Sequence, residues 1–166
     1  MTVLLILRCT ERLQRKLGIW PAGNAPASTT VLGDWYGNIF NTRSVRLVMF
    51  VSERSRLSVL VAGRDFGTLA PRFQLAVVEV LKGLGIPRMA IENEQQSMRD
   101  VAFASTRSRS VLATMNDYFK NLRWSLEVKP HFTLAEYALD LSETPVGPLN
   151  YATPGDLTRK LFSSPK

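Results

Sequence analysis

The chain has 166 residues, and its 21 Lys and Arg against 14 Asp and Glu leave a net charge of +7 with the one His neutral. This length and a hydrophobic content of 45% indicate one globular domain and exclude a disordered chain. One Cys excludes an intrachain disulfide, and a single Cys with a single His argues against a zinc site, so we expect no metal and no cofactor. No apolar run approaches the ~20 residues that span a bilayer, and we expect no membrane partner.

The first 62 residues predict a strand, a short helix and a three-stranded meander. The apolar stretch 3–7 is too short and lacks the preceding basic residue for a secretory signal, so we expect a buried strand and a cytoplasmic protein. Thr10 can cap a helix over 11–17 that ends at Gly18. A loop rich in Pro, Gly and Ser follows, and β-branched and aromatic residues between polar turns then predict strands over 35–40, 46–51 and 57–61.

The rest of the chain is predicted to be mainly helical. Apolar residues at helical spacing and capping residues such as Thr133 predict helices over 71–84, 87–97, 111–126 and 134–142, a strand over 101–104 and a last helix ending near 162. We therefore expect an α+β fold in one domain, 1–166. Its small, mainly antiparallel sheet would have its hydrophobic face covered by helices 71–84 and 111–126.

The positive charge is concentrated in the N-terminal part. Residues 1–64 carry nine Lys and Arg but only three Asp and Glu. Such an imbalance attracts phosphate, so our leading hypothesis is a non-enzymatic accessory protein that contacts nucleic acid. Phosphate contacts would come from Arg43, Arg46, Arg54 and Arg56, and stacking from Trp35 or Tyr36. If Arg107 and Arg109 shared that surface, they would extend an anion-binding rim.

Two other functions stay open. Asp34, Asn38, Asn116 and Asp117 could form the polar pocket of an enzyme or small-ligand binder, which requires segments 34–38 and 116–117 to meet. Alternatively, the chain could be a protein-interaction module, an inhibitor or antitoxin-like partner, or a homodimer. A large exposed apolar patch would favour an interaction module.

Cys9 and Arg15 have the spacing of a phosphatase phosphate-binding loop, in which a thiolate attacks phosphorus. The five residues between them lack glycine and favour helix, so they do not suit an open cradle. We therefore expect Cys9 to be a small buried hydrophobe. His131 has no evident nucleophile to serve and is expected at the surface.

Several segments together resemble one family of small bacterial proteins known only as a domain of unknown function. The resemblance rests on segments in this order: Arg8-Cys9-Thr10, Leu32-Gly33-Asp34-Trp35-Tyr36-Gly37-Asn38, Ser52-Glu53-Arg54, Ser110-Val111-Leu112-Ala113-Thr114-Met115-Asn116-Asp117 and Ser142-Glu143-Thr144-Pro145. It spans nearly the whole chain and implies a single domain in which segments 34–38 and 116–117 matter. It implies no activity, ligand or catalytic residue.

Overall fold

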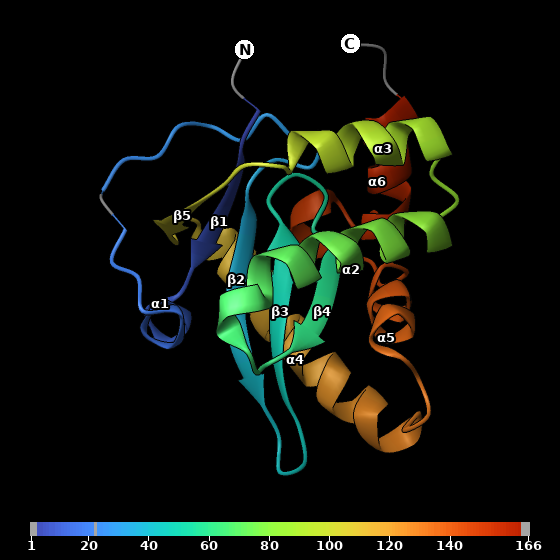
Figure 1. Ribbon diagram of the computed structural model, residues 1–166. Coiled ribbons are helices and arrows are strands. Elements are labelled where there is room, and N and C mark those ends of the chain that lie inside the picture. Colours follow the sequence, from blue (N-terminus) through green and yellow to red (C-terminus); the bar gives the residue numbers. More distant parts are fainter. Residues whose placement is uncertain (1–2, 22, 164–166) are drawn as a thin grey trace.

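The computed structural model describes residues 3–21 and 23–163, which form five strands and six α-helices (Figure 1). The strands are β1 (Leu5–Cys9), β2 (Trp35–Asn41), β3 (Arg46–Ser52), β4 (Ser58–Ala62) and β5 (Val101–Ser105). The helices are α1 (Glu11–Leu17), α2 (Leu69–Gly83), α3 (Arg88–Ser97), α4 (Arg109–Val128), α5 (Leu134–Leu141) and α6 (Pro154–Ser163). Short 3-10 turns, η1 (Phe66–Thr68) and η2 (Gly147–Leu149), precede α2 and α6. None of the helices in these ranges is long and apolar enough to cross a bilayer.

The five strands form one mixed sheet in the order β4-β3-β2-β1-β5. Strands β2, β3 and β4 are the predicted antiparallel meander, whereas β1 runs parallel to both β2 and β5. The β1–β2 pair is parallel because α1 and the connection after it return the chain to the beginning of β1. Strand β2 therefore runs in the same direction as β1. The predicted α+β class is confirmed.

Both faces of the sheet are buried, whereas the sequence predicted a single hydrophobic face. On one face Leu7, Phe50 and Val61 pack against α1, α2 and α3, and on the other Met49 and Leu60 pack against α4 and α5. Figure 1 shows α2 in front of the sheet and α4 behind it. The expectation that helices 71–84 and 111–126 cover the same face is therefore wrong. Unbroken apolar runs such as 47–51 are typical of strands buried on both faces.

Local signals in the sequence set the ends of the short helices. The Thr10 side chain accepts the N–H of Leu13 at the start of α1, and Gly18 ends the helix in the left-handed conformation with φ 68°. Thr133 and Glu136 form the predicted capping box of α5.

Gly37 allows α1 to pack closely on the sheet. A Cβ atom at this position would lie 2.7 Å from the Phe50 ring and 3.0 Å from the Leu13 side chain. This glycine therefore makes room for two core side chains.

The long connection between α1 and β2 is fixed at its last residues. The buried carboxylate of Glu94 in α3 accepts the N–H groups of Val31 (2.8 Å) and Leu32 (3.1 Å). Ser28 accepts the N–H of Ile6 in β1, and Thr29 hydrogen-bonds to the backbone of Leu4 just before that strand. These bonds place the start of β2 beside β1.

Glu94→Ala should destabilise the fold by about 2–4 kcal/mol, because it leaves two backbone N–H groups without their charged acceptor. Urea unfolding measures this loss. Glu92→Ala on the same helix removes only an exposed ion pair with Arg88 and should cost less than about 1 kcal/mol. Equal losses for the two variants would contradict the anchoring role of Glu94.

Candidate functional site

Charged and polar side chains gather where the end of β1, the turn between β3 and β4, and the start of α4 meet. We call this group the polar cluster, and its members are Arg8, Asp34, Tyr36, Glu53, Arg56, Arg107 and Ser110. It joins four segments that are distant in the sequence.

The innermost part of the polar cluster is an ion pair between Arg8 and Asp34. The Arg8 Nε atom donates to the Asp34 carboxylate at 2.7 Å, and both side chains are buried. Arg8 also donates to the carbonyl of Ser105 at the end of β5, and the hydroxyl of Ser28 donates to Asp34 at 2.7 Å. Strand alternation explains its position: Arg8 pairs with Tyr36 and with the small Ala104, which leaves space for the guanidinium.

Arg56 connects the β3–β4 turn to α4. Its backbone has a left-handed φ of 62°, and its carbonyl accepts the hydroxyl of Tyr118 at 2.7 Å. The guanidinium donates to the carbonyl of Glu53 and, at 3.0 Å, to the hydroxyl of Ser110. Its Nε atom is buried without a hydrogen-bond partner among the described residues, and burial lowers the pKa of the group.

Tyr36 and Arg107 form the outer part of the polar cluster. The Arg107 guanidinium lies 3.9 Å from carboxylate oxygens of both Asp34 and Glu53, too far for hydrogen bonds, and the side chain is 62% exposed. Burial and the charge of Glu53 raise the pKa of the Tyr36 phenol, while Arg8 and Arg107 oppose this shift. The buried Tyr36 hydroxyl has no hydrogen bond of standard geometry within the described ranges. The Tyr36 hydroxyl is therefore a donor without an acceptor among the described residues, and it lies beside the exposed Arg107.

The start of α4 adds further positive potential. Ser108 caps the helix by accepting the N–H of Val111, which leaves the N–H groups of Arg109 and Ser110 directed outward. A helix of 20 residues carries a partial positive charge at this end. Together with the exposed Arg107 and Arg109, these groups can bind an anion.

The arginines proposed from the sequence fall into two pairs at opposite ends of β3. Arg43 and Arg46 lie at the β2–β3 turn, whereas Arg54 and Arg56 lie at the β3–β4 turn, and the intervening strand is about 20 Å long. The four side chains therefore do not form one compact cluster. Arg107 does reach Glu53, so the β3–β4 turn shares its surface with the start of α4.

Trp35 and Tyr36 cannot supply a stacking surface in this conformation. Both side chains have 0% exposure and point to opposite faces of the sheet. The Trp35 ring packs edge-on against Phe73 with centroids 5.2 Å apart. Their role in the described structure is to fill the core.

The residues of the alternative polar pocket are engaged elsewhere. Asp34 is buried with Arg8, and the Asn38 side chain accepts the hydroxyl of Thr10 at 2.8 Å. Asn116 and Asp117 are exposed on α4, and Asp117 lines a hollow against loop residues 144–148. No hydrogen bond or ion pair joins the two segments in the described chain. The described residues also contain no group of three or more His, Cys, Asp or Glu placed to hold a metal ion.

Cys9 is fully buried in the core next to α1. Burial raises the pKa of its thiol from 9.0 to about 12, so the thiolate that a phosphatase needs does not form near neutral pH. The expectation of a small buried hydrophobe is confirmed. His131 is exposed, as expected.

Two central residues of the polar cluster, Arg8 and Arg107, were not among the site residues chosen from the sequence. Arg8 could have been found because a charged residue between Leu7 and Cys9 interrupts a buried strand, and buried charges require partners. Arg107 offers no comparable signal, since its contacts depend on how β5 and α4 pack.

Comparison with known proteins identifies one family. The family profile described as "Domain of unknown function (DUF6933)" matches residues 6–157, which include every member of the polar cluster. Neither the curated proteins nor the solved structures gave a significant match to the chain.

Asp34→Ala should destabilise the protein by about 3–5 kcal/mol, because it leaves the buried Arg8 charge without its counterion. Urea unfolding provides the measurement. Asp156→Ala breaks an exposed pair with Arg159 and should cost less than about 1 kcal/mol. A similarly small loss for Asp34→Ala would show that the buried pair is not needed for folding.

The native protein should not react with Ellman's reagent at pH 8, whereas the urea-unfolded protein should react fully. Because the folded state holds the Cys9 proton to about pH 12 and the unfolded state loses it near 9.0, stability should fall as pH rises above 9. The contribution is about 1.4 kcal/mol per pH unit. Cys9→Ala should unfold with a smaller decrease between pH 9 and 10, and an equal decrease would contradict this origin.

Proposed function

The chain belongs to the family described as "Domain of unknown function (DUF6933)", and we propose that it binds the phosphate groups of nucleic acid at the start of α4. The observation that carries the proposal is the meeting of the β3–β4 turn with the start of α4. It brings Arg107 and Arg109 to one end of the sheet, with the buried Arg8 and Arg56 behind them, whereas Arg54 in the same turn donates to the carbonyl of Val31 at 3.0 Å.

The charges at this end favour an anion over a cation. Four arginines (Arg8, Arg56, Arg107 and Arg109) stand against Asp34 and Glu53, and the Asp34 carboxylate already accepts hydrogen bonds from Arg8 and Ser28. Arg107 is 62% exposed and lies 3.9 Å from its two carboxylate partners, so its guanidinium can turn to an incoming phosphate at little cost. Ser110 accepts from Arg56, which leaves its own hydroxyl proton free to donate.

The expected binding mode is recognition of the backbone without base readout. Phosphate contacts set affinity and orientation, whereas sequence is read through base edges or stacking. Since Trp35 and Tyr36 are buried, the aromatic surface proposed from the sequence does not contribute. Binding should therefore depend strongly on salt and weakly on sequence.

Arg107→Ala combined with Arg109→Ala should weaken binding of mixed-sequence DNA and RNA, measured by fluorescence anisotropy across a range of salt concentrations. Loss of two phosphate contacts should reduce the slope of log affinity against log salt by about 2. Both side chains are exposed, so the fold should be retained, which a thermal unfolding curve checks.

The matched control is Arg43→Ala combined with Arg46→Ala, which removes the same charge at the opposite turn. It should leave affinity and slope close to those of the unmodified protein. Equal weakening by both pairs would indicate only a response to net charge, and no binding at low salt would also reject the proposal.

A further inference from the structure

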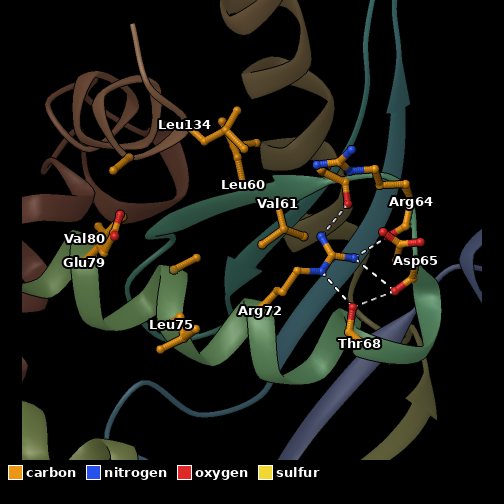
Figure 2. Close-up of a pocket in the computed structure, with 13 residues that line it drawn as sticks. Leu60, Val61, Arg64, Asp65, Thr68, Arg72, Leu75, Glu79, Val80 and Leu134 are labelled. Carbon is orange, nitrogen blue, oxygen red and sulfur yellow. Dashed lines mark hydrogen bonds between the residues drawn. The ribbon is translucent and has the colours of Figure 1, made fainter.

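A mainly apolar concavity lies away from the polar cluster, between β4, α2 and the start of α5. Its volume is about 360 Å³ (Figure 2). We call it the β4 groove. Its walls are mainly apolar, and they are formed by Leu60, Val61, Leu75, Ala76, Val80, Leu134 and Ala135. Leu75 is 61% exposed and adds apolar surface to this wall.

The two ends of the β4 groove carry opposite charges. Arg64 and Arg72 outnumber Asp65 at the end near Thr68, and Glu79 lies toward the other end. Figure 2 shows the Arg72 guanidinium bonded to surrounding oxygens, including the carbonyls of Ala62 and Asp65. Arg64 and Glu79 are exposed, and neither side chain forms an ion pair within the described residues. Both are therefore available to a bound molecule.

The edge of β4 can contribute one backbone donor. Bonds from Gly63 to Arg46 and from Ser52 to Leu57 set the register, so the N–H groups of Leu60 and Ala62 point away from β3. Leu60 is nearly buried, but Ala62 is half-exposed and lines the groove. Its N–H can donate to the carbonyl of an extended chain, as in strand addition.

We propose that the β4 groove binds an extended segment of another protein that is apolar in the middle and carries opposite charges at its ends. An acidic residue would lie beside Arg64 and a basic residue beside Glu79. Arg64 lies at the same end of the groove as Thr68 (Figure 2), and from Thr68, the residue before α2, to Glu79 the helix rises about 16 Å. About five residues of extended chain cover that length, so the two charges should be about five residues apart. The site is independent of nucleic-acid binding at α4.

The test is selection from a displayed library of random nine-residue linear peptides on the full-length protein. Selected peptides should carry an acidic and a basic residue about five positions apart with apolar residues between them. The best peptide is then measured against Arg64→Glu combined with Glu79→Arg. This exchange conserves net charge, and its two exposed positions should leave folding intact. Binding should weaken at least about tenfold, and a peptide with its end charges exchanged should recover it.

The matched control is Arg88→Glu combined with Glu92→Arg, which exchanges the charges of an exposed pair outside the β4 groove. It should change affinity by less than about twofold. Failure to enrich any peptide, or equal affinity for the Arg64 and Glu79 exchange variant, would overturn the proposal. So would a concentration-dependent dimer in size-exclusion chromatography that this exchange dissociates, because the occupant would then be a second copy of the chain.

Discussion

The buried ion pair between Arg8 and Asp34 is the constraint on which the arrangement of the parallel strands depends. It joins the end of β1 to the residue before β2, and Arg8 also holds the last carbonyl of β5. A buried pair gains little over an apolar pair, because removing two charges from water costs several kcal/mol. The ion pair instead fixes positions. Because the Arg8 guanidinium bonds both Asp34 and Ser105, it holds the end of β1, the start of β2 and the end of β5 relative to one another. The surface at the start of α4 is built on that arrangement.

The sequence was a good guide to elements whose causes are local. Thr10, Gly18 and Thr133 act through hydrogen bonds within a few residues, so helix ends could be predicted from neighbouring side chains. The meander was also predictable, because its strands are joined by short polar turns. The direction of β1 was not, since parallel pairing depends on where a long connection returns.

The candidate site was harder to predict because its residues are far apart in the sequence and close together only in the folded chain. Arg54 and Arg56 are close to Arg43 and Arg46 in the sequence, yet a full strand separates the two pairs. Arg107 lies more than 50 positions from Glu53 and contacts it. Net charge along the chain therefore indicated a basic protein without locating its basic surface. The aromatic pair failed as a prediction for a related reason, since both faces of the sheet are covered at Trp35 and Tyr36.

Gly37 couples the packing of α1 on one face of the sheet to the position of β1. Phe50 and Leu13 occupy the space where a side chain would be, so any substituent would push α1 outward. Helix α1 begins two residues after Cys9, and Arg8 is part of the same strand on the opposite face. A methyl group at Gly37 would therefore displace α1, and through β1 that displacement would reach the Arg8 guanidinium on the other face. Under the proposed function, a defect in hydrophobic packing would then appear as a change in affinity for phosphate.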